Sequence, residues 1–346
     1  MDFFYLYLCN FQRSDYHYYV ILTFNFEMMK EYVIGIDIGG TFTKTGYVDH
    51  AGNCYAESVT PTDTFENVND YLENLVAVLR ESEKQLDGSY KITGVGVGAP
   101  NGNFHHGTIE NATNLKWRGI IPFADMVHKY YDLPVRLTND ANAAALGEMV
   151  YGGAKGIKDF IMITLGTGLG SGIVVNGDLV YGHDGFAGEI GHVNVVENGR
   201  KCGCGNHGCL ETYVSAPGIK RTVFELLAYD SRGSELVNYT FDELDSEMIY
   251  NAAEKGDTVA LKAFDFTSKI LGRKLADSVA HTSPEAVFLF GGLAKAGDYI
   301  FKPTKKYLEE SVMGPFKGKV KILPSQLTDK NAAVMGASAL IWKEFE

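Results

Sequence analysis

One local pattern occurs twice in this chain: a buried strand, a turn that contains glycine and threonine, and a second strand. The first copy spans residues 32–48 and turns at Gly39-Gly40-Thr41, and the second spans residues 159–175 and turns at Gly166-Thr167-Gly168. The nearly continuous apolar run before each turn is typical of a strand buried on both faces. Two such units predict an α/β fold of two related halves with a cleft between them.

Further helices and strands are expected around this repeat. Apolar residues at helical spacing predict helices, and short apolar runs bounded by turn residues predict strands. No low-complexity linker interrupts the chain. The predicted helices cover residues 66–86, 141–151, 241–280 and 332–343, and the predicted strands outside the repeat cover residues 92–97, 133–137 and 286–290.

Composition narrows the class of protein. The chain has 346 residues, enough for two domains, and its 45% hydrophobic and 21% charged residues are ordinary for a soluble globular protein. A formal net charge of −12 argues against a nucleic-acid-binding surface, which needs a basic patch. Three of the five cysteines are clustered, unlike the dispersed pattern of a disulfide-stapled secreted protein. We therefore expect a cytoplasmic protein without nucleic-acid or membrane partners.

Residues 1–29 form an aromatic extension before the first predicted strand. They lack the basic start, long apolar centre and small-residue cleavage site of a signal peptide, and they are too polar for a membrane-spanning helix. Met28 and Met29 directly precede the strand. We expect translation to begin naturally at one of these methionines; the alternative is a genuine but poorly ordered extension. The intact mass of the native protein distinguishes the two.

Both glycine-containing turns are candidates for phosphate binding. Glycines let backbone amides approach phosphate oxygens closely, and Asp37, which ends the first strand, could hold magnesium through water. Lys44 could offset phosphate charge. The turn at Gly166-Thr167-Gly168 matches neither the dinucleotide fingerprint nor the Walker loop. Either turn alone could be an ordinary glycine hairpin, but the pair favours a phosphate site.

Asp140 is the candidate for acid–base chemistry. It lies between the predicted strand over residues 133–137 and the predicted helix over residues 141–151, which is the usual location of ligands in open α/β folds. The alternative role is a helix N-cap, since Asn and Asp favour that position. The two glycine loops that flank Asp140 in the sequence favour a general base.

Three cysteines and a histidine predict a metal site. Cys202, Cys204 and Cys209 lie within eight positions, and His192 precedes them by ten residues. Thiolate and imidazole ligands at this spacing suit a closed tetrahedral zinc site. His207 is the rival imidazole, and a redox dithiol is the alternative for the cysteines. Such a metal would fix the loop that carries its ligands.

Two acidic residues flank the metal cluster. Glu189 lies among small residues just before His192, and Glu211 ends the cysteine segment. Small neighbours permit the close approach of a polyhydroxylated ligand, although a lone glutamate is more often an ordinary surface residue. A metal-braced loop would present both carboxylates to the cleft.

The motifs described above occur together and in this order in one known family. From about Glu31 to its C-terminus, the chain resembles the ROK family (repressors, open reading frames and sugar kinases) of the actin-like ATPase superfamily. The cysteine segment and the Glu-x-Gly-His segment are the most specific parts of this resemblance. It rests on Asp37-Ile38-Gly39-Gly40-Thr41, Thr138-Asn139-Asp140-Ala141-Asn142, Leu165-Gly166-Thr167-Gly168, Gly188-Glu189-Ile190-Gly191-His192 and Cys202-x-Cys204-Gly205-x-x-Gly208-Cys209-x-Glu211.

The resemblance implies a duplicated actin-like ATPase (ribonuclease H-like) fold, with two domains around a central cleft in which ATP and a sugar meet. The smaller α/β domain would comprise residues 30–138 and 330–346, and the larger one residues 139–329 with the zinc loop. The implied activity is ATP-dependent phosphorylation of a hexose hydroxyl, first of all of glucose to glucose 6-phosphate. Members of the family are commonly dimers or tetramers, so a homo-oligomer is expected.

The resemblance also implies roles for matched residues, with Asp140 as the catalytic base. The implied sugar-binding residues are Gly102, Asn103, Asn114, Asn139, Asp140, Glu189, His192 and Glu211. The residues implied for ATP and Mg²⁺ are Asp37, Gly39, Gly40, Thr41, Lys44, Gly166, Thr167, Gly168, Gly291 and Gly292. A structural Zn²⁺ would be bound by His192, Cys202, Cys204 and Cys209. The loop over residues 98–103 departs from the Gly-x-x-Asp arrangement of many members, and Phe290 stands where a glycine is frequent.

Several functions remain open within this resemblance. The sugar could be N-acetylmannosamine, fructose, allose or N-acetylglucosamine, and the phosphoryl donor could be polyphosphate. A sugar-responsive repressor would need an N-terminal helix-turn-helix of roughly sixty residues, which the aromatic, non-basic segment before the first strand does not match. A non-catalytic sugar-binding protein would need neither Asp140 nor two phosphate loops.

Overall fold

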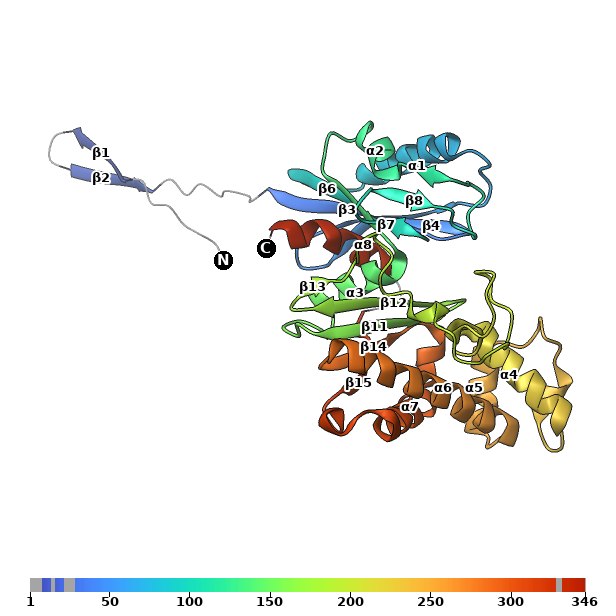
Figure 1. Cartoon of the computed structure of the whole chain (residues 1–346). Coiled ribbons are helices and arrows are strands. Elements are labelled where there is room, and N and C mark those ends of the chain that lie inside the picture. Colours follow the sequence, from blue (N-terminus) through green and yellow to red (C-terminus); the bar gives the residue numbers. More distant parts are fainter. Residues whose placement is uncertain (1–7, 14–15, 22–28, 328–331, 346) are drawn as a thin grey trace.

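The computed structural model describes residues 8–13, 16–21, 29–327 and 332–345. Over these residues the chain forms two lobes, stacked one above the other in Figure 1. The first lobe is built on a five-stranded sheet of order β10-β6-β3-β4-β5, and the second on a five-stranded sheet of order β13-β12-β11-β14-β15. The predicted α/β fold with two related halves is thereby confirmed.

The first lobe contains the first copy of the repeat. Its strands β3 and β4 are antiparallel, whereas β3, β6 and β10 are parallel to one another, so the carboxyl ends of these three meet at one edge of the sheet. Ligands of open α/β sheets bind at such an edge. The strands are β3 (Lys30–Ile38), β4 (Phe42–Val48), β5 (Cys54–Pro61), β6 (Tyr90–Gly98) and β10 (Val135–Thr138).

The second lobe repeats this order of strands. β11 pairs antiparallel with β12 and parallel with β14, as β3 does with β4 and β6. The carboxyl ends of β11, β14 and β15 therefore share one edge as well. The strands are β11 (Phe160–Leu165), β12 (Leu169–Val175), β13 (Asp178–Leu179), β14 (Ala286–Phe290) and β15 (Lys321–Pro324).

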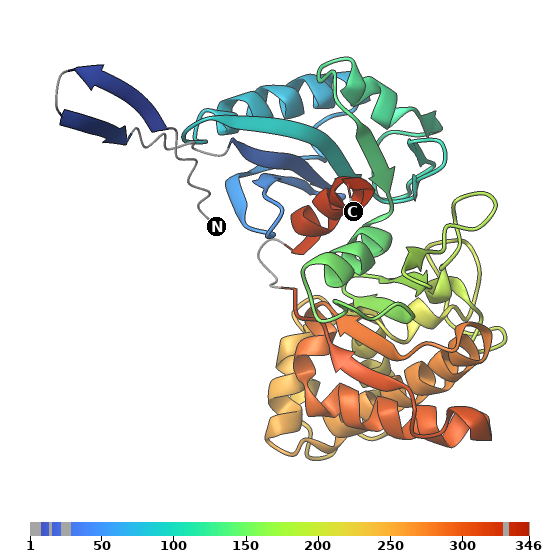
Figure 2. The ribbon, with the colours of Figure 1, turned by 90° about the vertical axis from the view of Figure 1, so that its left-hand side faces the viewer.

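Helices cover the outer faces of both sheets (Figures 1 and 2). The α-helices are α1 (Val68–Glu83), α2 (Phe123–His128), α3 (Asp140–Val150), α4 (Ala216–Tyr229), α5 (Ser246–Glu254), α6 (Thr258–Thr282), α7 (Asp298–Ser311) and α8 (Ala332–Trp342). Short 3₁₀ helices cover Ile190–His192, Leu210–Thr212, Glu235–Asn238, Gly292–Ala296, Gly314–Phe316 and Lys343–Phe345.

The segment predicted to be helical over residues 241–280 is helical for most of its length, but not in one piece. The segment contains two helices, α5 and α6, separated at residues 255–257. Gly256 adopts a left-handed backbone, with φ of +83°, which ends α5. The Asp257 side chain then caps α6 by accepting hydrogen bonds from the amides of Val259 (2.9 Å) and Ala260 (3.1 Å). The spacing of apolar residues continues through both helices, so it does not reveal that one helix ends and another begins.

Helices α3 and α8 lie between the two sheets and cross at close range (Figure 2). A Cβ atom added to Gly336 of α8 would lie 2.5 Å from the carbonyl oxygen of Ala143 in α3, and one added to Gly147 of α3 would lie 2.9 Å from the Cα of Gly336. Glycine is required on both sides of this crossing. α3 packs on β12 and β11, and α8 packs on β3 and β6, so the pair joins the lobes.

Smaller elements complete the described chain. A three-stranded sheet contains β7 (Gly102–Asn103), β8 (Thr108–Glu110) and β9 (Ile120–Ile121), and an antiparallel pair contains β1 (Leu8–Arg13) and β2 (Tyr16–Ile21). Residues 1–7, 14–15 and 22–28, on which part of the start-site prediction falls, lie outside the described residues. Among the described helices, none has the length and apolar character needed to cross a membrane.

Candidate active site

Asp140 is the first residue of α3 and directly follows the carboxyl end of β10. The N-cap of this helix is Asn139, whose side-chain oxygen accepts a hydrogen bond from the Asn142 amide at 2.7 Å. Asn139, and not Asp140, is therefore the N-cap of α3. The Asp140 carboxylate accepts one hydrogen bond, from the Ala141 amide at 2.8 Å, and its side chain is exposed. It is thus held in place but open to a ligand.

Asp37 and Asp140 lie within electrostatic reach of each other at the carboxyl edge of the first sheet. Desolvation and then the negative charge of Asp140 raise the pKa of Asp37 to about 6, while Lys44, its partner in the β3–β4 register, opposes the shift. Desolvation also raises the pKa of Asp140, because protein surrounds the carboxylate densely even though one side faces solvent; the Ala141 amide opposes this. A raised pKa makes each carboxylate a stronger base than an ordinary aspartate.

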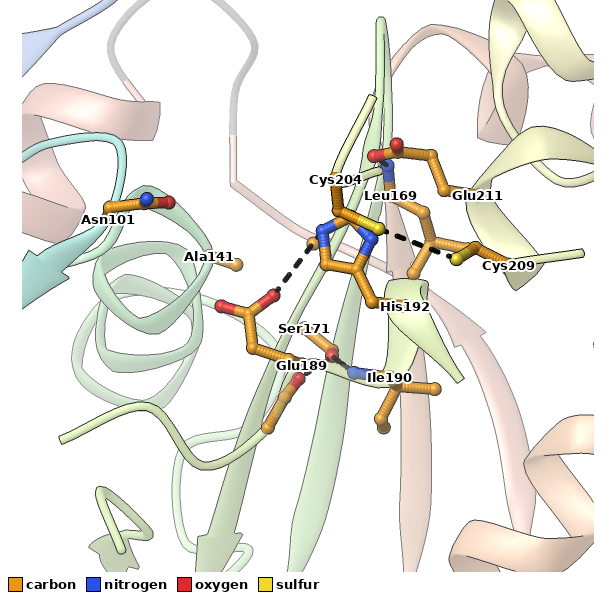
Figure 3. Close-up of polar contacts among 12 residues, drawn as sticks. Asn101, Ala141, Leu169, Ser171, Glu189, Ile190, His192, Cys204, Cys209 and Glu211 are labelled. Atoms are coloured by element: carbon orange, nitrogen blue, oxygen red, sulfur yellow. Dashed lines mark hydrogen bonds and ion pairs between the residues drawn. The ribbon is translucent and has the colours of Figure 1, made fainter. Parts of the chain in front are cut away.

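Glu189, beside His192 in the second lobe, lies within electrostatic reach of Asp140. The Nε2 atom of His192 lies 3.9 Å from a Glu189 carboxylate oxygen (Figure 3). Desolvation raises the pKa of Glu189, His192 opposes the shift, and the negative charges of Asp140 and Glu211 add to it. These interactions show that Asp140, Glu189, His192 and Glu211 lie near one another, although the first and last are 71 positions apart in the sequence.

The four predicted zinc ligands converge. One ligand atom from each of His192, Cys202, Cys204 and Cys209 lies within 4.8 Å of all the others. The Cys204 and Cys209 sulfurs are 3.7 Å apart, and the Cys202 sulfur is 3.6 Å from the Nδ1 atom of His192. A tetrahedron with Zn–S bonds of about 2.3 Å has S···S edges of about 3.8 Å, so these donors fit zinc in both chemistry and spacing.

The alternatives for this cluster fit less well. A disulfide needs sulfurs about 2.05 Å apart, and the described cysteines of the cluster are free thiols. The rival imidazole, His207, is paired with Lys201 across an isolated β-bridge and is not part of the converging group. The orientation of His192 is also informative, because Nδ1 faces the sulfurs and Nε2 faces Glu189.

Glu211 connects the metal cluster to the second glycine loop. One carboxylate oxygen accepts a hydrogen bond from the Leu169 amide at 3.0 Å (Figure 3). The other lies 3.6 Å from the Cys202 sulfur. A Cβ atom added to Gly168 would lie 2.5 Å from the first of these oxygens, so a larger residue there would displace the Glu211 carboxylate. Thr167, by contrast, is exposed and available to a ligand.

The other glycines predicted to bind phosphate or adenosine lie at the same two sheet edges. Gly291, directly after β14, has φ of +101°, and an added Cβ would lie 2.5 Å from the Leu165 carbonyl oxygen. It therefore packs beside the loop that begins at Gly166. In the first lobe, an added Cβ on Gly40 would lie 2.9 Å from the carbonyl oxygen of Asn114. Gly39 belongs to the same turn, and Gly292, like Gly166, has open space at the position of a Cβ.

Gly102 and Asn103 lie beside the end of β10. A Cβ on Gly102 would lie 2.3 Å from the Thr138 carbonyl oxygen. The Asn103 side chain is only 1% exposed, and its oxygen accepts a hydrogen bond from the His105 amide at 3.0 Å while its nitrogen donates to the Asp184 carbonyl at 2.8 Å. Of the predicted sugar-binding side chains, this one is turned into protein rather than towards Asp140.

Sequence reasoning missed Arg200, which holds the metal loop. Its guanidinium donates to the carbonyl oxygens of Thr212 (2.8 Å) and Gly218 (2.9 Å) and lies 4.4 Å from the centroid of the Tyr213 ring. The side chain is 10% exposed and also pairs with Glu225. A lone arginine two residues before a cysteine carries no sequence signal of burial, so this role is visible only in the fold.

Comparison with known proteins identifies the family of this chain. A model of the ROK family matches residues 33–344. A glucokinase from Halalkalibacterium halodurans is 37% identical, over 82% of this chain and 86% of the relative, and a xylose repressor from Caldicellulosiruptor bescii is 30% identical, over 89% and 77%. The crystal structure of a ROK family glucokinase from Streptomyces griseus in complex with glucose and AMPPNP matches with a TM-score of 0.75 and 31% identity, over 90% of this chain and 99% of that one. The chain therefore belongs to the ROK family, as its motifs predicted.

Proposed function

We propose that this protein is an ATP-dependent glucose kinase that forms glucose 6-phosphate. The observation that carries the proposal is the convergence of Asp140 with Glu189, His192 and Glu211 beside two glycine loops from opposite lobes. The glucokinase relative and the glucokinase structure that holds glucose and AMPPNP support the choice of sugar and donor.

Asp140 is the general base in this proposal. It removes the proton from the sugar hydroxyl as the hydroxyl oxygen attacks the γ-phosphorus of ATP. The bond from that phosphorus to the bridging oxygen breaks, and ADP leaves with the electron pair. Such a base contributes roughly 10²–10⁴-fold to the rate, and most of the remainder comes from positioning and charge stabilisation.

The sugar is held by the wall that carries Glu189, His192 and Glu211, with Asn139, Asn114 and Gly102 completing the site from the first lobe. Carboxylates accept from sugar hydroxyls, and His192 can donate through Nε2, which faces Glu189. A site that pairs each hydroxyl rejects sugars that leave one of its polar groups unpaired.

Zinc and magnesium have separate roles in the proposal. His192, Cys202, Cys204 and Cys209 would bind a structural Zn²⁺, which fixes the tautomer of His192 through Nδ1. Asp37 would hold hydrated Mg²⁺ beside the phosphates, with Thr41, Lys44 and the amides of both glycine loops as further phosphate contacts. Magnesium neutralises charge that develops on the phosphoryl oxygens.

The remaining features of the proposal concern the whole protein. Residues 30–138 with 330–346 act as one domain, residues 139–329 as the other, and the protein is a cytoplasmic homo-oligomer. N-acetylmannosamine, fructose, allose and N-acetylglucosamine are the alternative sugars, and polyphosphate is the alternative donor. The xylose repressor relative makes a sugar-responsive repressor the minor alternative.

An ADP-release assay across a panel of hexoses tests the proposal, with Asp140→Asn as the key variant. We expect glucose to be the best substrate, and we expect Asp140→Asn to bind glucose while its kcat falls by roughly 10²–10⁴-fold. Asp70→Asn is the matched control, because Asp70 also lies in the first turn of a helix, α1, but outside the cleft. Near-normal turnover by Asp140→Asn would remove Asp140 from the role of base.

A further inference from the structure

Two loops from opposite lobes are joined beside the cleft. Residues 103–105 come from the first lobe and residues 181–185 from the second. The Asn103 side-chain nitrogen donates to the Asp184 carbonyl at 2.8 Å, and the His105 Nε2 atom lies 2.8 Å from the Gly182 carbonyl, to which it can only donate. The Phe104 and Tyr181 rings stack, with centroids 4.1 Å apart and planes 6° apart.

The fit between the loops is close. A Cβ atom added to Gly185, whose φ is +87°, would lie 2.5 Å from the Asn103 side-chain oxygen, so that glycine admits Asn103. The same oxygen accepts the His105 amide, which orders the first loop for contact with the second. A cavity of about 340 Å³ borders the ring stack, and Leu146 of α3 and Leu340 of α8 are among the residues that line it. The two rings also pack against the apolar cluster that contains Leu146, Leu179 and Leu340.

Both loops continue directly into the proposed sugar site. Gly102 packs against Thr138, two residues before Asp140. Gly185 is four residues before Glu189, and the far end of that segment is pinned by Ser171, which donates to the Gly188 carbonyl and accepts from the Ile190 amide at 3.2 Å (Figure 3). The segment that carries Glu189 is thus fixed after Gly188 by Ser171 of its own lobe, and at Gly185 by Asn103 of the opposite lobe.

We propose that Asn103, Phe104 and His105 with Tyr181 and Gly182 form an interlobe clasp that positions Glu189 opposite Asp140 and thereby sets the affinity for the sugar. This proposal rests on the proposed function. The clasp residues are positioning residues, since they contact each other, backbone, the Thr138 side chain and the apolar core, not the reacting groups. Loosening the clasp leaves Asp140 and both phosphate loops in place, so the sugar affinity falls while the nucleotide affinity does not.

Kinetics of wild type, Phe104→Leu, Tyr181→Leu and the double variant test the clasp. We expect KM for glucose to rise about 3- to 10-fold in each single variant, which is the scale of one aromatic pair, with KM for ATP within 2-fold of wild type. The double variant should be little worse than Tyr181→Leu, because both single variants remove the ring stack and Tyr181→Leu also removes the hydrogen bond to Thr138. Equal rises in both KM values, or a lower melting temperature with an unchanged KM for glucose, would overturn the proposal.

A pair of exposed histidines gives a milder test that does not endanger folding. His105 and His128 each contact one backbone carbonyl, at 2.8 Å and 3.0 Å, but His128 contacts Leu133 within its own lobe. His105→Ala should raise KM for glucose, and His128→Ala should not; the same KM in both would contradict the clasp. A wild type that phosphorylates no hexose overturns the proposed function itself, whereas an active wild type with unresponsive variants overturns the clasp alone.

Discussion

The raised pKa of Asp37 makes the stability of the protein depend on pH. This pKa is raised to about 6 by desolvation and by Asp140. Below its ordinary pKa near 4, the carboxyl is protonated in both the folded and the unfolded chain, so folding carries no penalty. As the pH rises through about 6, the folded protein must ionise a desolvated group, and stability is lost. The window of this loss lies between about pH 4 and pH 6.

We therefore expect Asp37→Asn to gain stability over wild type as the pH rises. A shift of about two units corresponds to about 3 kcal/mol, and partial exposure of the side chain reduces this to about 1–2 kcal/mol. Urea unfolding in magnesium-free buffer at pH 4 and pH 7 measures the difference, with Asp70→Asn as the control. An advantage of the variant that is the same at both pH values would contradict the assignment.

The metal cluster makes a second prediction for single residues. Cys204 and Cys54 are both free cysteines, but only Cys204 belongs to the converging group. Elemental analysis of purified protein should find about one zinc per chain in wild type and in Cys54→Ser, and far less in Cys204→Ser, because three remaining ligands bind zinc much more weakly than four. Unchanged zinc in Cys204→Ser would contradict the assignment.

Single elements differ in how well their sequences predict them. The strands over residues 32–38 and 286–290 are continuous apolar runs, and β3 and β14 follow them closely. β5 was missed because it is an edge strand, with burial that alternates instead of persisting. α4 and α7 were also missed. α7 has a proline inside it, and a proline inside a helical pattern normally argues against one.

The parts of the candidate site whose residues are close in sequence could be predicted from their spacing. The parts that depend on contacts between distant residues could not. His192 and three cysteines are close in sequence, so the cluster could be read directly. The burial of the Asn103 side chain could not be predicted, because it depends on a hydrogen bond to the Asp184 carbonyl, 81 residues away. The same is true of Arg200, whose partners lie in a 3₁₀ helix and in α4.

The contacts of Arg200 predict that this side chain stabilises the metal loop. Arg200→Met keeps the aliphatic stem but leaves the carbonyl oxygens of Thr212 and Gly218 without their charged donor. We expect a loss of about 2–3 kcal/mol in unfolding free energy and faster zinc release to a chelator. Arg232→Met is the control, because Arg232 is 90% exposed and pairs only locally with Asp230. Equal effects of the two variants would mean that Arg200 does not anchor the loop.

The chain passes between the two lobes at two places, and these connections determine how the lobes are joined. The chain passes from the first lobe to the second through α3 and returns by way of the segment that follows β15. Glu148, near the end of α3, is 0% exposed and binds both connections: it accepts from the Gly153 amide (2.7 Å), the Ser325 hydroxyl (2.5 Å) and the Gln326 amide (2.9 Å). This buried carboxylate therefore ties the end of α3 to the segment after β15.

Glu148→Gln should consequently disturb the relation between the lobes as well as stability. The glutamine oxygen can still accept from the Gly153 and Gln326 amides, and its NH₂ group can donate to the Ser325 hydroxyl, but the charge that strengthens these hydrogen bonds is lost, at about 1–2 kcal/mol. Glu309→Gln is the matched control, because Glu309 also accepts a backbone amide, that of Gly318 at 2.8 Å, but lies in α7 within one lobe. Both variants should melt earlier than wild type, whereas only Glu148→Gln should change how far glucose shrinks the radius of gyration in solution scattering. If both variants contract with glucose as wild type does, Glu148 stabilises the fold without governing the movement of the lobes.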